Sequence, residues 1–188
     1  MGSPDPLAAA FAAVPRRDFL PRAQRRSAAY DGPLPIGHGQ TCSQPRTVAD
    51  MLRLLDVRLG QRVLDVGSGS GWTTALLAHL VGPGGRVEGV EVVPELALSA
   101  AARVARAGMT WASVHEAQPG VLGLPGRAPY DRVLVSADGG RLPDELVEQL
   151  DVPGRLVLPV AGRMLVVQRT AEGVTTEAHG HYRFVPLL

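Results

Sequence analysis

The sequence has little cysteine, little net charge and no long hydrophobic run, and each absence excludes a class of protein. A single cysteine, Cys42, cannot form an internal disulfide. A formal net charge of +1, with acidic and basic residues interspersed, gives no electrostatic footprint for nucleic acid. No apolar stretch is long enough to span a membrane, and the N-terminus lacks a signal-peptide pattern. We therefore expect a cytoplasmic protein with neither nucleic-acid nor membrane partners.

After about residue 45, short apolar runs alternate with helical patterns. The predicted strands span residues 62–66, 87–91, 111–115, 132–137, 155–160 and 164–169, and the tail, residues 178–188, ends in a further strand-like run. The predicted helices span residues 5–14, 45–57, 72–81, 95–107 and 144–150, and the Gly- and Pro-rich segment 30–44 is predicted to be irregular. Strands separated by helices require parallel pairing, whereas the short connection 161–163 favours an antiparallel hairpin. The expected fold is α/β, a Rossmann-like doubly wound, mostly parallel sheet with an antiparallel C-terminal edge.

The most informative motif is a glycine-rich turn. Residues 63–71 read Val-Leu-Asp-Val-Gly-Ser-Gly-Ser-Gly, and a helical pattern begins directly at Trp72. Such a strand–turn–helix brings backbone amides against a nucleotide-like ligand. Glu91 ends the next predicted strand, where a carboxylate can accept the hydroxyls of a ribose. Together these features predict a cofactor site, and the alternative is a glycine-rich turn that binds nothing.

The spacing of the glycines indicates which cofactor fits. Gly67, Gly69 and Gly71 form Gly-x-Gly-x-Gly, whereas a dinucleotide fingerprint is Gly-x-Gly-x-x-Gly. The pattern suits an adenosyl ligand without pyrophosphate, such as S-adenosylmethionine, and disfavours a nicotinamide oxidoreductase. The acid at position 91 would also repel a 2′-phosphate. The residues predicted to bind this cofactor are Asp65, Gly67, Ser68, Gly69, Gly71, Glu91 and Val92.

Further motifs resemble the bacterial protein-L-isoaspartate O-methyltransferases. The matching segments are 14–21, Tyr30, 33–45, 65–71, Glu91 with 94–96, 128–131, 154–160 and 183–187. Segment 37–45 is the specific part, because other methyltransferases share only the glycine turn. The resemblance implies a class I S-adenosylmethionine-dependent enzyme that esterifies the α-carboxyl of L-isoaspartyl residues in damaged proteins or peptides. The ester then collapses to a succinimide.

The resemblance also implies a domain organisation and a substrate site. A single methyltransferase domain over residues 1–188, expected to be a monomer, divides into an N-terminal helix and substrate lip (about 1–45) and a cofactor-binding core (46–188). The resemblance places Ser43 at the substrate carboxylate as a hydroxyl donor, although a serine here is also suited to cap the following helix. The other residues implied in substrate binding are His38, Gln40, Thr41, Cys42, Phe184 and Val185.

Simpler structural roles remain open for several of these residues. Cys42 and Phe184 would equally serve apolar packing, and His38 would equally stabilise a turn. The reaction needs no metal, because a carboxylate is already ionised at neutral pH and the methyl group is already activated. No convincing metal-ligand spacing is present either. Arg16, together with Arg17, Arg22, Arg25 and Arg26, is interpreted as part of a solvated basic face.

Two departures from the family pattern affect the expected site. The family's Gly-Asp-Gly after the third core strand is missing, and Glu116 or Gln118 is the candidate to bind the adenine in its place. Asp138 follows the fourth strand, where its charge would repel a substrate carboxylate unless it points to solvent. These departures keep two alternatives open: a carboxyl methyltransferase dedicated to an aspartyl residue of a maturing peptide, and a non-catalytic relative that has lost cofactor affinity.

Overall fold

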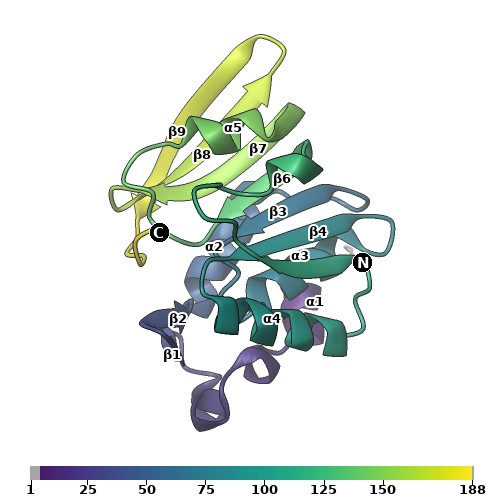
Figure 1. The fold of residues 1–188 in the computed structure, drawn as a ribbon, viewed down its shortest axis with the longest axis vertical. Helices are drawn as coiled ribbons and strands as arrows, with labels where there is room; N and C mark the ends of the chain where they lie inside the picture. The colour runs from purple at the N-terminus through teal and green to yellow at the C-terminus, as the bar shows by residue number, and fades with distance from the viewer. Residues whose placement is uncertain (1–4, 188) are drawn as a thin grey trace.

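In the part of the chain that the computed structural model describes, residues 5–187, seven strands form one central sheet in the order β5-β4-β3-β6-β7-β8-β9 (Figure 1). The strands of this sheet are β3 (Arg62–Val66), β4 (Arg86–Glu91), β5 (Ala112–Glu116), β6 (Tyr130–Val135), β7 (Leu150–Val160), β8 (Arg163–Thr170) and β9 (Gly173–His181). The α-helices are α1 (Pro6–Ala13), α2 (Pro45–Leu55), α3 (Trp72–Val81), α4 (Pro94–Arg106) and α5 (Asp144–Glu148). Short 3₁₀ helices are η1 (Arg16–Phe19), η2 (Arg22–Ser27) and η3 (Pro125–Arg127).

The sheet is parallel from β5 through β7 and antiparallel at β8 and β9. Strand β3 lies near its centre and is buried on both faces, as its almost continuous apolar sequence predicts. Helices α2, α3 and α4 cover one face, and α5 with the loop after β5 covers the other. The predicted α/β fold with an antiparallel C-terminal edge is confirmed.

Strand β3 pairs with β4 on one side and β6 on the other, although β6 lies about 65 residues further along the chain. The direction of winding therefore reverses between β3 and β6. In open α/β sheets, ligands bind at the carboxyl ends of the strands where this reversal occurs. The fold thus directs attention to the residues that follow β3, β4 and β6. No helix among residues 5–187 has the length and apolar character that crossing a membrane requires.

The prediction of an irregular segment over residues 30–44 is wrong in part. Strands β1 (Leu34–Gly37) and β2 (Gln40–Cys42) form an antiparallel hairpin there. Leu34, Ile36 and Cys42 are buried, so alternating residues of the hairpin face the core. Proline is tolerated because β1 pairs with one neighbour only and its other edge needs no donor. The density of Gly and Pro concealed this alternation.

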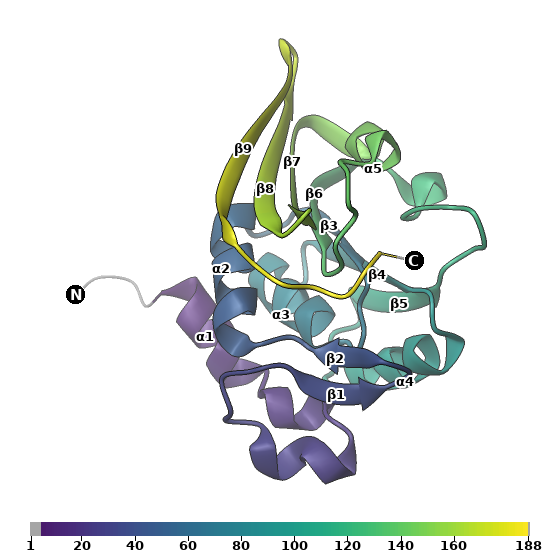
Figure 2. The ribbon, with the colours of Figure 1, turned by 90° about the vertical axis from the view of Figure 1, so that its left-hand side faces the viewer.

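The strand-like run expected at the end of the tail, residues 178–188, is not a strand of the sheet in the part that the structure describes, which ends at residue 187. Strand β9 starts earlier and ends at His181, and the described residues after it form an extended tail. The backbone of Asp138 holds this tail through hydrogen bonds with Val185 (2.8 Å) and Leu187 (2.8 Å). Figure 2 shows the tail passing between the β1–β2 hairpin and the ends of the sheet strands. The apolar run 184–187 faces this gap instead of extending the sheet.

The predicted boundaries around α5 also differ from the structure. The helix ends at Glu148, and β7 already begins at Leu150, five residues before the predicted strand. Gln149 between them is buried and accepts a hydrogen bond from the backbone of Leu124 (2.9 Å), so tertiary contacts end the helix.

Candidate active site

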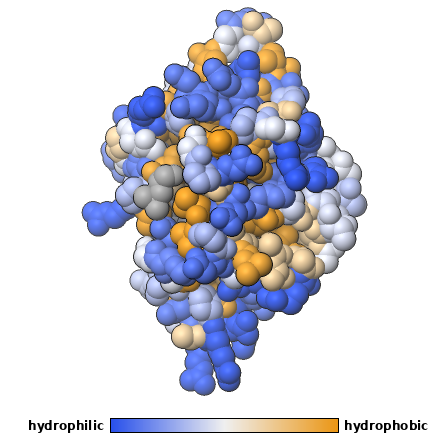
Figure 3. Space-filling model, viewed as in Figure 1, coloured by the Kyte–Doolittle hydropathy of each residue, from blue (hydrophilic) through white to orange (hydrophobic). Residues whose placement is uncertain are grey.

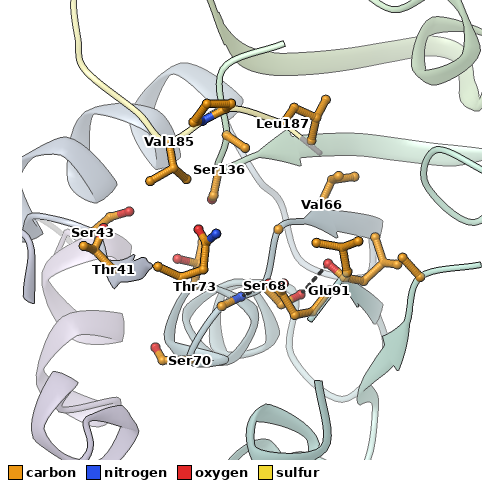
Figure 4. Close-up of a pocket in the computed structure, with 18 of the residues that line it drawn as sticks. Thr41, Ser43, Val66, Ser68, Ser70, Thr73, Glu91, Ser136, Val185 and Leu187 are labelled. Carbon is orange, nitrogen blue, oxygen red and sulfur yellow. Dashed lines mark hydrogen bonds between the residues drawn. The ribbon is translucent and has the colours of Figure 1, made fainter. Parts of the chain in front are cut away.

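A cleft opens at the carboxyl ends of β3, β4 and β6, where the winding of the sheet reverses (Figure 4). Its empty volume is about 850 Å³, a figure that includes open solvent at the mouth. The segments that line it are 40–43, 66–70, 72–73, 90–92, 117, 121–123, 136–137 and 185–187. Six regions that are separate in the sequence thus meet around one space.

The glycine turn forms the floor of this cleft. Gly67 and Ser68 donate backbone hydrogen bonds to the Val90 carbonyl (2.9 and 3.1 Å), which ties the turn to β4. Gly69 has a φ of +52°, and a Cβ at this position would lie 3.3 Å from Ile36 Cδ1 of the hairpin. Glycine therefore permits both the left-handed backbone and the close approach of the hairpin.

Glu91 ends β4 and is buried beside this turn. Its Oε2 accepts a hydrogen bond from the Gly69 amide (2.8 Å), and its Oε1 accepts one from the Val93 amide (3.0 Å). A carboxylate offers about four lone-pair sites, so each oxygen can accept a further hydroxyl. The backbone thus fixes the carboxylate at the cleft wall while leaving it able to bind a pair of ligand hydroxyls.

Among the other residues predicted to bind the cofactor, Gly67, Ser68, Gly69 and Val92 line the cleft, and Asp65 and Gly71 do not. A Cβ at Gly71 would lie 3.2 Å from the Ala100 side chain and backbone, so this glycine allows α3 to pack against α4. The third glycine of the motif therefore serves helix packing.

Asp65 lies beneath the turn, fully buried. Its Oδ2 accepts a hydrogen bond from Thr74 Oγ1 (2.6 Å), while Oδ1 has no partner among the described residues. Burial raises the pKa of Asp65 to about 7, and the charge of Glu91 adds to this effect against the hydrogen bond from Thr74. Asp65 thus supports the turn from below and titrates near neutrality.

The wall after β5 is apolar. Ala117, Val121 and Leu122 line the cleft, whereas Glu116 and Gln118, the candidates for adenine binding, are exposed outside its lining. The Ala117 amide donates to the Glu91 carbonyl (2.8 Å), which anchors the start of this loop. Because the loop has no regular structure, no sequence periodicity marked residues 121–123 as part of the wall.

The lip opposite Glu91 comes from the hairpin. Gln40, Thr41, Cys42 and Ser43 line the cleft, and Figure 4 shows Thr41 and Ser43 on the side away from Glu91. His38 is exposed at the tip of the hairpin with a φ of +53°, outside the lining. One cavity therefore contains both the glycine turn and the predicted substrate lip.

The alternative role of Ser43 as a helix cap is not what the structure has. Helix α2 begins at Pro45 with Gln44 as its N-cap, and the Gln44 side chain makes no capping hydrogen bond with the helix backbone. Instead, Asp31 Oδ1 accepts a hydrogen bond from the Arg46 amide (3.0 Å). The Ser43 side chain is thus not engaged as the cap of α2.

Only one residue of the third wall of the cleft was predicted. Ser136 and Ala137 follow β6, and Val185 and Leu187 come from the tail (Figure 4). Val185 was expected at the substrate site through the family resemblance. Ser136 was missed, although its position at the carboxyl end of a central parallel strand was a usable signal. Outside the resemblance the tail carried no such signal, because its place depends on the backbone of Asp138.

A second hollow adjoins the cleft on the side of the tail. It shares Ser43, Ser136 and Val185 with the main cleft and adds Arg183 and Phe184. Phe184, which the resemblance implies in substrate binding, thus lines this adjoining hollow and not the cleft itself. The two hollows thus adjoin at Ser43.

Asp138 has a different role from the repulsion expected of it. Its carboxylate accepts hydrogen bonds from the amides of Gly140 (2.9 Å), Ala161 (2.9 Å) and Gly162 (3.0 Å), and it is not part of the lining. The bond from Gly140 is the largest of the causes that lower the pKa of Asp138. The carboxylate therefore joins the loop after β6 to the β7–β8 turn.

The interpretation of the five arginines as one solvated face is wrong for Arg16. That residue is only 5% exposed, whereas Arg17, Arg22, Arg25 and Arg26 are exposed. Figure 3 shows the hydrophilic lower end of the molecule, where the N-terminal 3₁₀ helices lie in Figure 1. Among residues 5–187, no group of three or more His, Cys, Asp or Glu side chains is placed to hold a metal ion.

Comparisons with known proteins agree in both sequence and fold. The family model described as protein-L-isoaspartate(D-aspartate) O-methyltransferase matches residues 2–188. A protein-L-isoaspartate O-methyltransferase of Methanopyrus kandleri is 43% identical over 187 residues, which cover 97% of this chain and 83% of the relative. One of Aeropyrum pernix is 45% identical over 184 residues, covering 95% of this chain and 71% of the relative.

Two solved structures share the fold. One, named protein-L-isoaspartate O-methyltransferase, superposes with a TM-score of 0.89 at 25% identity, covering 98% of this chain and 61% of its own. This chain thus spans less than two thirds of that structure's length. A Plasmodium falciparum structure, described under the same enzyme name and in complex with S-adenosyl-L-homocysteine, superposes with a TM-score of 0.84 at 24% identity, covering 100% of this chain and 92% of its own.

Proposed function

This chain belongs to the protein-L-isoaspartate(D-aspartate) O-methyltransferase family, and from that premise we propose that it methylates the α-carboxyl group of L-isoaspartyl residues in damaged proteins and peptides. Its methyl donor is S-adenosylmethionine. The resulting ester collapses to a succinimide, which can reopen to a normal aspartyl linkage and so initiates repair. The observation that carries the proposal is the single cleft that contains both the glycine turn with Glu91 and the lip with Ser43.

The residues of the cleft suit this cofactor. Gly69 has no Cβ, and this leaves space between the turn and the hairpin that a larger residue would narrow. Glu91 offers carboxylate oxygens at the wall of the cleft. Gly67, Ser68, Gly69, Glu91 and Val92 would hold the adenosyl group and its amino-acid arm. The cofactor supplies a methyl group on a sulfonium, which needs no further activation.

The chain's own residues then have to position the two reacting groups and shield them from water. A carboxylate is ionised at neutral pH, so no general base is required. The Ser43 hydroxyl would donate a hydrogen bond to the substrate carboxylate and orient it, while Gln40, Thr41 and the tail residue Val185 would surround the peptide. Holding the reacting groups together and excluding water supplies most of the rate acceleration.

We further propose that the enzyme acts as a cytoplasmic monomer, without nucleic-acid or membrane partners. Residues 1–188 would form one methyltransferase domain, with the hairpin as a substrate lip on the cofactor-binding core. Support for a dedicated peptide substrate came only from Asp138, and the carboxylate of Asp138 is occupied by three backbone amides. The repair function is therefore favoured over that alternative.

A methyl-transfer assay tests the proposal directly. An isoaspartyl peptide and its normal aspartyl twin are incubated with the full chain and S-adenosylmethionine labelled in the methyl group. We expect base-labile label in the isoaspartyl peptide only. Equal labelling of the twins, or none in either, would overturn the proposed function. Calorimetry with S-adenosylmethionine in the same preparation distinguishes an inactive enzyme that still binds its cofactor from a scaffold that has lost it.

A further inference from the structure

Arg16 is a buried cation whose hydrogen bonds all go to neutral acceptors. Its Nη1 donates to the Tyr30 carbonyl (2.9 Å), and its Nη2 lies within hydrogen-bond distance of the carbonyls of Gly32 (2.8 Å), Cys42 (2.9 Å) and Ser43 (2.9 Å). Its Nε also donates to Cys42 Sγ (3.4 Å). Burying an arginine without an acidic partner is costly, so every carbonyl in this set matters to it.

These carbonyls stand at the two ends of the β1–β2 hairpin. Gly32 lies two residues before β1, while Cys42 ends β2 and Ser43 follows it. One guanidinium therefore holds the base of the hairpin closed and fixes the backbone of Ser43. The planar fork of arginine can reach several acceptors at once, whereas a lysine ammonium is a point donor on a flexible stem.

The other side of the guanidinium faces the cofactor half of the cleft. It stacks on the ring of Trp72 at 5.5 Å, and Trp72 opens α3 directly after the glycine turn. Trp72 is itself oriented by a hydrogen bond from its Nε1 to the Val14 carbonyl (3.0 Å). Trp72, Cys42 and Ser43 all line the same cleft. Arg16 thus contacts the substrate lip directly and, on the cofactor side, the Trp72 ring that follows the glycine turn.

We propose that Arg16 is a positioning residue for methyl transfer. It holds Ser43 in register with the glycine turn, and through Trp72 it couples cofactor binding to the order of the lip. The expected effect of Arg16 on turnover rests on the proposed function. Its expected effect on the order of the lip does not. A purely structural arginine would stabilise the fold without linking the lip to the cofactor.

The test compares Arg16→Lys and Arg16→Met with wild type and with Arg17→Met as a matched control. Arg17 is the exposed neighbour in η1. In Arg16→Lys we expect kcat/KM for the isoaspartyl peptide to fall by about 100-fold, mostly in kcat, because a misplaced lip misaligns the acceptor. Affinity for S-adenosylmethionine alone should stay within about threefold, since Arg16 touches the cofactor turn only through Trp72. Arg17→Met should match wild type.

A second readout does not depend on turnover. Hydrogen exchange of the amides in residues 34–43 is followed with and without S-adenosylmethionine. In wild type the cofactor should slow this exchange, and in Arg16→Lys that slowing should be lost while the exchange of β3 and β6 is unchanged. If Arg16→Met does not fold, Arg16→Lys, which keeps the charge, carries the comparison.

The outcomes separate the two proposals. Wild type that fails to methylate the isoaspartyl peptide but shows cofactor-dependent slowing, lost in Arg16→Lys, would refute the proposed function and sustain the coupling role of Arg16. An Arg16→Lys variant with wild-type kcat and wild-type slowing would refute the role of Arg16. So would a loss of activity that simply follows a loss of folded protein in a thermal melt.

Discussion

The two walls of the cleft are built in different ways. The cofactor wall consists of residues 66–70 and 90–92, which directly follow β3 and β4, and its geometry comes from backbone hydrogen bonds between these neighbouring strands. The substrate wall joins segments 40–43, 136–137 and 185–187, which lie far apart in the sequence. A buried arginine and the backbone of Asp138 hold this second wall together.

The two walls are therefore expected to be sensitive to different substitutions. The cofactor wall depends on side chains that touch the ligand space, above all Glu91, because its backbone is part of the central sheet. The substrate wall depends also on residues that do not line the cleft, such as Arg16, because a hairpin, a loop and a tail meet there outside the strands of the central sheet. Five substitutions test this comparison.

The largest effect is expected at the cofactor wall. In Glu91→Ala the Gly69 amide loses its acceptor and the proposed cofactor hydroxyls lose theirs. Two charge-assisted hydrogen bonds correspond to a cofactor Kd weakened by roughly 100-fold. Calorimetry with S-adenosylmethionine measures this, and Glu95→Ala, an exposed acid four residues on, is the control. An unchanged Kd in Glu91→Ala would remove Glu91 from the cofactor site.

A smaller loss, confined to turnover, is expected at the substrate wall. Ser43→Ala removes one hydroxyl that we expect to orient the substrate carboxylate, and kcat/KM should fall about tenfold. Cofactor affinity should be unchanged, because Ser43 stands opposite Glu91 (Figure 4). Steady-state kinetics with Ser27→Ala, an exposed serine, as control check this. Loss of cofactor affinity together with turnover would mean that the two walls are not separable.

The cofactor wall should also carry a pH-dependent group of its own. Burial raises the pKa of Asp65 to about 7 from 3.8. A group whose pKa is higher in the folded than in the unfolded state stabilises the fold fully at pH values below its unfolded-state pKa. This stabilisation is lost as the pH rises through its folded-state pKa. Wild type should therefore lose free energy of unfolding between about pH 4 and pH 7, and Asp65→Asn should lose less over this range. Urea unfolding of both proteins at several pH values measures this difference. Identical pH profiles of the free energy of unfolding in wild type and Asp65→Asn would contradict the prediction.

The pKa of Glu88, on the other face of the sheet, is shifted in the opposite direction from that of Asp65. Glu88 therefore serves as an internal comparison. Burial alone would raise its pKa, but hydrogen bonds from Ser113, Arg86, His115 and Arg127 outweigh burial and lower the pKa to about 2. Glu88 therefore stabilises the fold at pH values above its unfolded-state pKa, and this stabilisation is lost as the pH falls toward its folded-state pKa. In Glu88→Gln the acid-induced loss of stability should shrink while the loss on approaching neutral pH remains.

The smallest effect is expected at Asp138, behind the substrate wall. Asp138→Asn weakens the bonds to Gly140, Ala161 and Gly162 but keeps the backbone bonds to the tail. We expect about 1 kcal/mol or less of lost stability, because water replaces part of these exposed bonds. The KM for the isoaspartyl peptide should rise only a few-fold. Thermal melts and kinetics measure both, and a loss of turnover as large as in Ser43→Ala would show that the carboxylate acts on the substrate.

The elements of the cofactor half could be predicted because their signals are local. The apolar run of β3, the glycine spacing and the acid at the end of β4 lie within about 30 residues of one another. Errors arose where packing overrides local pattern. The β1–β2 hairpin was missed because its own Gly and Pro residues concealed the alternation of buried and exposed positions.

The substrate half shows the limit of such reasoning. Ser43 and its neighbours were identified only through a family resemblance, and Arg16 was taken for a solvated residue because an arginine beside other arginines usually is one. Nothing in its local sequence indicates that four carbonyls from residues 30–43 converge on it.

The amino-acid sequence by itself determined the fold class, the glycine turn and the placement of Glu91, because hydrophobic periodicity and glycine spacing act over one or two elements. Only the tertiary structure decided that Arg16 is buried behind the lip, that Asp138 holds a turn, and that the tail closes the cleft. Those arrangements depend on hydrogen bonds between segments brought together by the completed sheet, and no local pattern encodes which distant carbonyl or amide will be the partner.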